Sequence, residues 1–529
     1  MTTSRPHFAL ILLAILVFAL AGSTSLFPSI SHALTFENGK TGEITWGDGN
    51  VEDTMPRAVV FGSVLWVFYL SRNMEDGYHP ADIVYRTYDG AGWSARKNLT
   101  ATPGEERDIA LLATATTLCA VWITDDPTHT SGGDWDVVAR AYTPRSGWGE
   151  TVEITPANDT GDDYHPTLAE WGDGVVVFWE HRETRAKTGE KTDILARTWD
   201  PLNGALGAVE NLTADFKGTS IRPSAKSSGE MSEMLWLSWV TNDTAISTGE
   251  DMDIVAAPVN VTADNMDVSL GEIYEVCSPV NTGLDLDPHT FFYGGKPWVI
   301  WETEDKAISH GDDRDLMVSF FNAAENTWEE PVEYTSPHDT GDDSFPITLS
   351  AKGYVFVVWN TDDPTYTSGS DWDILLSPIN NTGLSNISLL DEVTPPKDGY
   401  DDGSFVYRGF AAAAYGGEVF VFWETKNPDV SAGGDSDIVY QTVFLSEGGG
   451  TPGDEGPGEK DEKDEKDGAA IDMGGLLVPA VIASVAIGLV VGAYLSGRRV
   501  NGGGGGENRV GRTGERTKER QKKKGQKIG

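Results

Sequence analysis

The stretch Gly174–Trp199, GVVVFWEHRETRAKTGEKTDILARTW, decides the fold. It contains an apolar β segment ending in Trp179, a polar loop, and a second β segment that opens with Asp193. The aspartate stands at position 14 when the tryptophan is counted as position 0, and this spacing recurs in six places. The tryptophans are Trp122, Trp179, Trp239, Trp301, Trp359 and Trp423. Their aspartate partners are Asp136, Asp193, Asp253, Asp315, Asp373 and Asp437.

A seventh, divergent copy comes first in the chain. It has Tyr69 in the tryptophan position, and Asp82 stands at position 13, one earlier than in the other copies. Between Asp82 and Asp437, the aspartate of one copy precedes that of the next by a mean of about 59 residues. A repeat of this size, made of short β segments, indicates a propeller or another repeat array.

Each unit contains four β signals. In the third unit we predict strands at Pro166–Trp171, Val175–Trp179, Asp193–Trp199 and Ala208–Thr213. The second strands are continuous apolar runs, which are typical of strands buried between neighbouring sheets. Seven units of four antiparallel strands, with no helical pattern, predict an all-β fold, a seven-bladed β-propeller. A sandwich or two separate sheets are the alternatives, and the regular spacing argues against them.

The two ends of the repeat region complete each other. The last unit supplies only three strands, and the chain leaves it at Leu445. The missing outer strand is predicted at the N-terminal side, at Gly42–Trp46. Pairing it with the last unit closes the ring and removes a free sheet edge.

The loop and strand signatures resemble those of known propeller families. TSGGDWDVVARAY (Thr130–Tyr142) and TSGSDWDILLSP (Thr367–Pro378) are similar to the hairpins of TolB-type propellers, and also to the Gly-x-Asp-x-x-Asp-Leu loops of integrin-α-type propellers. The second resemblance implies calcium binding, although the integrin-type loop has more regularly spaced oxygen ligands. The tetrapeptide SIRP at Ser220–Pro223 resembles a motif of sialidases. The Asp box that is typical of sialidases, Ser-x-Asp-x-Gly-x-Thr-Trp, is absent from this sequence. The resemblance to propeller families extends over the whole repeat region, but it concerns the blade architecture.

Segments outside the repeats indicate a membrane-anchored surface protein. Residues 1–33 have a basic start, an apolar run and small residues before a cleavage site after Ala33, as in a secretory signal peptide, with a retained N-terminal anchor as the alternative. The ectodomain then covers 34–446, an acidic Gly/Pro-rich stalk 447–472, a transmembrane helix 473–496 and a basic cytoplasmic tail 497–529. This arrangement resembles anchored surface proteins of archaea, with bacteria as the alternative.

Composition limits the partners. The formal net charge of −43 argues against nucleic-acid binding, which requires surplus Lys and Arg. The only two cysteines, Cys119 and Cys277, exclude a disulfide scaffold and a Cys-rich zinc site, and Cys119 is expected to be a buried thiol. Seven Asn-x-Ser/Thr sequons make glycosylation of an exposed ectodomain an expectation. They begin at Asn98, Asn158, Asn211, Asn242, Asn260, Asn380 and Asn386.

Acidic residues recur in the loops between the second and third strands, and these loops share one end of the ring with the entries to the first strands. Clustered carboxylates on Gly-containing loops suit Ca²⁺, which takes 6–8 oxygen ligands. The candidate ligands stand at positions 4, 12 and 14, counted from the Trp position. They are Asp126, Asp134, Asp136, Asp243, Asp251, Asp253, Asp305, Asp313, Asp315, Asp363, Asp371, Asp373, Asp435 and Asp437.

The alternative is that each aspartate caps its own hairpin through backbone N–H groups. We favour capping for the aspartate at position 14, because it opens the third strand in every unit. For the aspartate at position 12, calcium and capping are equally supported. Lys191 and Asn427 depart from the acidic pattern, which argues against seven equivalent metal sites.

The expected function is that of a membrane-anchored binding or adhesion module that recognises an extracellular protein or glycan. An extracellular sialidase-like glycoside hydrolase is the alternative, because Arg57, Arg107, Arg222 and Arg408 stand near the starts of first strands. Catalysis predicts that such arginines converge with an acid, such as Asp163 or Asp287. Binding predicts dispersed arginines and a continuous acidic rim.

Overall fold

The computed structural model describes residues 34–45, 51–74, 79–130, 133–156, 160–183, 191–229, 234–247, 251–262, 266–277, 283–306, 309, 313–335, 340–364, 372–379, 391–392, 409–427 and 435–447. All of them belong to the first of the two units into which the chain divides, Met1–Thr451. The predicted signal peptide, transmembrane helix and tail, and nearly all of the stalk, lie outside these residues. None of the described residues forms a helix that is long and apolar enough to cross a membrane.

The described strands form seven antiparallel sheets, which we number as blades 1 to 7 in chain order of their innermost strands. The innermost strands are β2 (Val51–Phe61), β6 (Glu106–Ala113), β11 (Asp162–Trp171), β15 (Ser220–Ser227), β20 (Asp285–Tyr293), β25 (Asp343–Ala351) and β29 (Phe410–Tyr415). The second strands are β3 (Val64–Asn73), β7 (Leu118–Thr124), β12 (Gly174–Arg182), β16 (Leu235–Thr241), β21 (Lys296–Thr303), β26 (Tyr354–Thr361) and β30 (Glu418–Thr425).

The third strands are β4 (Asp82–Tyr88), β8 (Asp136–Thr143), β13 (Thr192–Trp199), β17 (Asp253–Val261), β22 (Asp315–Asn322), β27 (Asp373–Pro378) and β31 (Asp437–Glu447). The outer strands are short, and in three blades they consist of two segments. They are β5 (Lys97–Asn98), β9 (Gly147–Trp148) with β10 (Val152–Glu153), β14 (Leu206–Asn211), β18 (Val268–Leu270) with β19 (Tyr274–Glu275), β23 (Thr327–Trp328) with β24 (Val332–Glu333), β28 (Asp391–Glu392) and β1 (Leu34–Glu43).

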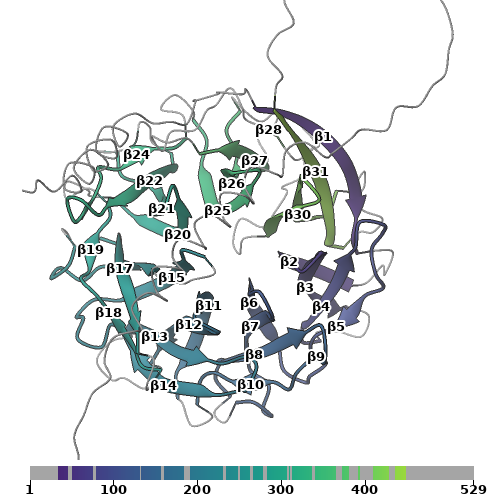
Figure 1. Cartoon of the computed structure of the whole chain (residues 1–529), viewed down its shortest axis with the longest axis horizontal. Coiled ribbons are helices and arrows are strands. Elements are labelled where there is room, and N and C mark those ends of the chain that lie inside the picture. The colour runs from purple at the N-terminus through teal and green to yellow at the C-terminus, as the bar shows by residue number, and fades with distance from the viewer. Residues whose placement is uncertain are drawn as a thin grey trace, which may run out of the picture. The chain divides into compact units, whose positions relative to one another are not determined.

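The seven sheets stand around a common centre (Figure 1). Each innermost strand contacts the innermost strand of the next blade, and β29 contacts β2, which completes the ring. The prediction of a seven-bladed β-propeller is therefore confirmed.

The ring is closed by the N-terminal strand, as predicted, but with different bounds. β1 runs from Leu34 to Glu43 and pairs antiparallel with β31 of blade 7. The sequence analysis placed this strand at Gly42–Trp46, which is too late in the chain. Ile44 and Thr45 continue the contact through hydrogen bonds from their N–H groups to the Ile438 carbonyl, and Trp46 lies outside the described residues.

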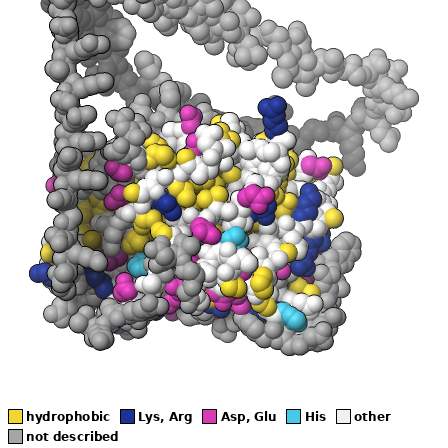
Figure 2. Space-filling view, turned by 90° about the horizontal axis from the view of Figure 1, so that it is seen from below, with side chains coloured by type: hydrophobic (Ala, Val, Ile, Leu, Met, Phe, Trp, Pro, Cys, Tyr) yellow, Lys and Arg dark blue, Asp and Glu magenta, His cyan; other side chains and the backbone are white. Residues whose placement is uncertain are grey.

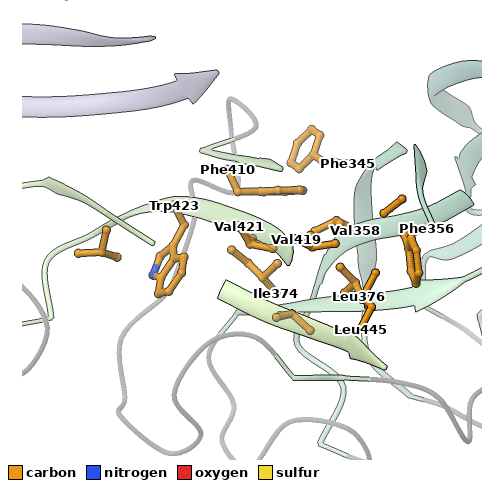
Figure 3. Packing of buried hydrophobic residues seen from close by; sticks show 13 residues of the cluster. Phe345, Phe356, Val358, Ile374, Leu376, Phe410, Val419, Val421, Trp423 and Leu445 are labelled. Atoms are coloured by element: carbon orange, nitrogen blue, oxygen red, sulfur yellow. The ribbon is translucent and has the colours of Figure 1, made fainter. Parts of the chain in front are cut away.

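The hydrophobic core is divided into seven clusters, one between each pair of neighbouring blades. The apolar run of β12 shows why these strands do not alternate with polar residues. Val175, Val177 and Trp179 pack toward blade 2, whereas Val176 and Phe178 pack toward blade 4. Both faces of the strand are covered, so both must be apolar. Figure 3 shows the corresponding cluster between blades 6 and 7.

The recurring tryptophans are core residues, and three of the six also have a hydrogen-bonding role. All six are at most 3% exposed. The indole N–H of Trp179, Trp301 and Trp359 donates to a buried aspartate in the innermost strand of the same blade, at 3.1, 3.0 and 2.8 Å. These acceptors are Asp163, Asp285 and Asp343. A buried indole requires an acceptor, and this pairing supplies it.

Candidate functional site

Every innermost strand whose start is described contains a β-bulge at the same place. The residue two positions after the buried acid, or after Ser220 in blade 4, has a positive φ of 48–55° although it is not glycine. These residues are Met55, Asp108, His165, Arg222, Asp287 and Phe345. In each strand the pairing register shifts across this position. Non-glycine residues rarely adopt this conformation and need support from their surroundings.

Buried glutamates of the second strands provide that support in three blades. Glu424 of blade 7 accepts the N–H of Met55 at 2.9 Å, and Glu302 of blade 5 accepts the N–H of Phe345 at 2.6 Å. Glu180 of blade 3 likewise accepts the N–H of Arg222. In each case the bulged residue belongs to the next blade around the ring. These glutamates therefore hold neighbouring blades together near the centre.

Glu424→Gln is expected to reduce the pH dependence of stability. Burial raises the pKa of Glu424 to about 7 from an ordinary value of 4.5. A raised pKa in the folded state stabilises the fold below the unfolded pKa, and that stability is lost as the pH rises through 7. The glutamate contributes a loss of about 3 kcal/mol between pH 4.5 and 8. Glutamine retains an acceptor oxygen for Met55 but does not titrate.

Urea unfolding at pH 5 and pH 8, with chelator present, measures this effect. The difference in unfolding free energy between the two pH values should be smaller in Glu424→Gln than in the wild type. Glu418→Gln, at the other end of β30, is the matched control and should keep the wild-type difference. An equal pH dependence in Glu424→Gln and wild type would contradict the assignment.

The arginines of the first strands have separate partners. Arg57 donates to the backbone carbonyls of Ile109 and Pro56, at 3.2 and 2.8 Å. Arg222 of blade 4 forms an ion pair with Asp287 of blade 5. Arg408 lies outside the described residues. The structure thus pairs Arg222 with a carboxylate of the next blade, and the guanidinium of Arg57 acts electrostatically on the carboxylate of Glu424.

Arg107 pairs with Glu105 at 3.0 Å, in blade 2.

His165 adds a further charge near the centre. Its Nδ1 lies 2.8 Å from Glu180 Oε1. Partial removal from bulk water alone would lower the pKa of His165, but the carboxylates of Glu180 and Asp108 outweigh this and raise it to about 9. The imidazole is therefore protonated at neutral pH.

Acidic and basic side chains lie interspersed on the side of the propeller shown in Figure 2.

The aspartates at position 4 are buried caps of their loops. Asp126, Asp243, Asp305 and Asp363 are at most 3% exposed. The N–H of each is bonded to the threonine hydroxyl two positions earlier, at 3.1–3.3 Å. Oδ1 of Asp126 accepts the N–H of Thr128 at 2.9 Å, a turn-capping bond.

In blades 2, 4, 5 and 6 a glycine before the innermost strand packs against these caps. A Cβ on Gly104 would lie 2.4 Å from the Cα of Asp126, and a Cβ on Gly283 would lie 2.4 Å from the Cα of Asp305. Only glycine allows so close an approach. The acidic loops are therefore held firmly against the entries to the first strands.

The aspartates at position 14 also have a structural role. Asp136, Asp253, Asp315, Asp373 and Asp437 are the first residues of their third strands. A threonine from the outer strand donates its hydroxyl to Oδ1 of Asp136, Asp315 and Asp437, at 3.2, 3.3 and 2.9 Å. The donors are Thr155, Thr335 and Thr45. This pairing is a side-chain contact and differs from the expected capping of backbone N–H groups, and it occupies one of the two carboxylate oxygens.

The second oxygen is different in blades 4 and 5. Oδ2 of Asp253 and Oδ2 of Asp315 are buried and have no hydrogen-bond partner at ordinary distance, and the nearby hydroxyls of Ser247 and Ser309 favour the ionised carboxylates only in part. Their neighbours at position 12, Asp251 and Asp313, each also have a buried Oδ2 without a hydrogen-bond partner. Burial raises the pKa of Asp253 and of Asp315 to about 7, and the nearby carboxylates raise it further. Buried carboxylate oxygens without a donor or a counter-charge are costly.

Outer-strand glutamates, which the sequence analysis did not single out, face these aspartates. The carboxylates of Asp253 and Glu275 and the thiol of Cys277 have ligand atoms within 4.8 Å of one another. In blade 5, Glu333 and Asp313 both act electrostatically on Asp315. In blades 2 and 7, Asp134 Oδ1 and Asp435 Oδ1 are likewise buried and accept no hydrogen bond. Asp371 lies outside the described residues.

Both cysteines are free and buried, as expected for Cys119. Cys277 takes the place of the outer-strand threonine in blade 4, where its Sγ lies 3.7 Å from Asp253 Oδ1.

The sequence matches no protein-family model and no curated protein. Among solved structures, a protein of unknown function from Dyadobacter fermentans DSM 18053 matches with a TM-score of 0.44 and 11% identity, over 78% of this chain and 99% of that chain. The phage phi92 endosialidase matches with a TM-score of 0.43 and 10% identity, over 84% and 77%. A Trypanosoma rangeli sialidase matches with a TM-score of 0.36 and 11% identity, over 77% and 58%. None of these likenesses bears on the chemistry of the site.

Proposed function

We propose that the chain is a membrane-anchored, cell-surface binding module whose propeller binds calcium in the loops at one end of the ring. The carrying observation is the set of buried carboxylate oxygens without a hydrogen-bond donor in blades 4 and 5. A divalent cation satisfies such oxygens, and oxygen-only donors at the end of a short loop suit Ca²⁺. Asp251, Asp253 and Glu275 would hold the ion in blade 4, and Asp313, Asp315 and Glu333 would hold it in blade 5.

A binding role is supported by how the loops are built. In blades 2, 4, 5 and 6 the described start of the loop after the second strand carries a buried aspartate that packs against a glycine before the innermost strand. A rigid scaffold carrying variable loops is suited to recognition. The glycosidase alternative is not better supported, because the pairing of Arg222 with Asp287 is equally compatible with a structural contact between blades 4 and 5.

Anchorage is the other half of the proposal, and it rests on the signal, stalk, span and basic tail of the sequence. Protease added to intact cells should release an acidic fragment by cutting within the stalk, 447–472. Resistance of the stalk to added protease would contradict an outward-facing propeller.

Calcium is expected to raise the melting temperature of the purified chain at pH 7.5. A ligand that binds only the folded state at a hundredfold excess over Kd adds about 2.7 kcal/mol per site. For the roughly 330 described residues the unfolding entropy is about 0.7 kcal/mol/K, so each site should add about 4 °C. Scanning calorimetry in calcium and in chelator measures the shift.

Asp313→Asn separates metal binding from capping. In chelator this change should raise the melting temperature, because it removes the repulsion between Asp313 and Asp315. The rise in melting temperature caused by calcium should be smaller in this variant than in the wild type, because the ion loses a charged ligand. Asp173→Asn, in the exposed turn at the opposite end of blade 3, is the control and should change neither value. A wild-type melting temperature that does not respond to calcium would refute the calcium part of the proposal.

A further inference from the structure

The seven blades are internal copies of one another, so residues at equivalent positions can be compared between blades. In every blade, one outer-strand residue pairs with the residue two positions after the third-strand aspartate. From blade 1 to blade 7 these outer-strand residues are Asn98, Glu153, Asn211, Glu275, Glu333, Glu392 and Glu43. The residue two positions before the same aspartate is Pro80, Asp134, Lys191, Asp251, Asp313, Asp371 or Asp435.

The two positions vary together. The five blades with an aspartate before the third strand all have a glutamate in the outer strand. The two blades without it, blades 1 and 3, both have an asparagine there. A blade therefore carries either three acids at this place or only one.

Blade 3 shows what replaces the missing acids. The ammonium group of Lys191 lies 2.8 Å from Asp193 Oδ1, and it donates to the carbonyls of Thr213 and Ala214 at 3.3 and 3.1 Å. The amide of Asn211 donates to Asp193 Oδ2 at 3.1 Å. The oxygen that has no donor in Asp253 and Asp315, Oδ2, is thus satisfied by Asn211 in Asp193, and Lys191 lies beside Oδ1, which also accepts the hydroxyl of Thr213 at 3.0 Å.

We propose that the Lys191 ammonium group occupies in blade 3 the place that a calcium ion takes in blades 4 and 5. It follows that the ion in blades 4 and 5 is held by the two loop aspartates, by the outer-strand glutamate, and by the backbone carbonyl of Cys277 or Thr335, the described equivalents of Thr213. Glu275 and Glu333 are then ligands, and the asparagine in blade 3 is the neutral partner that a lysine permits. The inference rests on the calcium part of the proposed function.

Charge and coordination support the exchange. Three carboxylates around a divalent ion leave a net charge of −1, whereas one carboxylate beside an ammonium group leaves zero. An ammonium group offers only hydrogens, so its contacts must all be acceptors, and the three atoms it meets are a carboxylate oxygen and two carbonyl oxygens. Oxygen atoms of these two kinds are also the ones that calcium selects.

Exchanging the residues between blades tests the proposal. Lys191→Asp with Asn211→Glu gives blade 3 the acids of blade 5, and Asp313→Lys with Glu333→Asn does the reverse. Blade 5 is the matched partner because Thr335 corresponds to Thr213, whereas blade 4 has Cys277. Equilibrium dialysis of the purified full-length chains against calcium counts the bound ions, and melts in chelator confirm that each variant folds.

The first double variant should bind one ion more per chain than the wild type, and the second should bind one fewer. Counts that stay at the wild-type value in the folded variants would overturn the inference while leaving calcium binding intact. A wild-type chain that binds no calcium would overturn both the inference and the calcium part of the proposed function. If one variant fails to fold, the count of the other still decides, because each predicts a change of opposite sign.

Discussion

Deleting Leu34–Thr45 is expected to abolish the folded ring rather than to leave six intact blades and one weakened blade. β1 forms eight residue pairs with β31, and backbone hydrogen bonds are worth about 1 kcal/mol each. Phe36 packs against Phe356 of blade 6 with ring centroids 6.3 Å apart, and Ile44 is fully buried between blades 7 and 1. The loss of roughly 8 kcal/mol or more is comparable with the whole stability of a domain.

Gel filtration and circular dichroism of the deleted chain measure the outcome. We expect aggregated or unfolded protein, because β31 becomes an exposed edge strand. A chain that lacks only residues 1–33 is the control and should be folded. A monomeric deletion variant with the melting temperature of this control would show that ring closure by β1 contributes little.

Trp301→Ala is expected to have the second largest effect. The side chain is fully buried between blades 4 and 5, and its indole donates to Asp285 at 3.0 Å. Truncating a buried tryptophan costs about 3–5 kcal/mol through lost contacts and the cavity that remains. The buried carboxyl group of Asp285 also loses its indole donor, which adds about 1–3 kcal/mol.

Trp301→Phe separates these two contributions. Phenylalanine keeps most of the apolar contact but cannot donate, so we expect a smaller loss, near that of the hydrogen bond alone. Chemical denaturation of the three chains gives the unfolding free energies. A phenylalanine variant as stable as the wild type would show that the indole-to-aspartate bond has no net stabilising effect.

The blade pattern was readable from the sequence because it depends on local order. Trp179 and Asp193 lie in adjacent strands of one hairpin, so their spacing is constant wherever the hairpin is repeated. The apolar runs follow from burial on both faces. The bounds of β1 were missed because the sequence of Leu34–Glu43 is largely polar, and only its pairing with β31, at the far end of the repeat region, makes it a strand.

The contacts between blades could not be read in the same way. Glu180 accepts a hydrogen bond from Arg222, which lies much later in the chain and in the next blade, and no local pattern marks that contact. The left-handed conformation of Asp108 or Phe345 is also invisible, because neither residue is a glycine. A local pattern does mark the outer-strand acids. Glu333-x-Thr335 recurs as Glu153-x-Thr155 and as Asn211-x-Thr213, with the acid changing together with Lys191.

The acids that the sequence suggested as calcium ligands have two different structural roles. Asp126 and Asp243 have the buried, capped geometry of loop anchors, and Asp136 and Asp315 pair with outer-strand threonines. Calcium binding by all fourteen candidates stays a prediction. The geometry favours it most for the acids of blades 4 and 5, where the aspartates at positions 12 and 14 both have a buried Oδ2 without a hydrogen-bond partner.

A crystal structure of the propeller grown in calcium, with anomalous scattering data, tests the account most directly. We predict anomalous peaks about 2.3–2.6 Å from Asp253 Oδ2 and Asp315 Oδ2, the usual range for calcium–oxygen bonds, and no peak beside Asp193. Density without a peak in blades 4 and 5, or with an equal peak at Lys191, would contradict it.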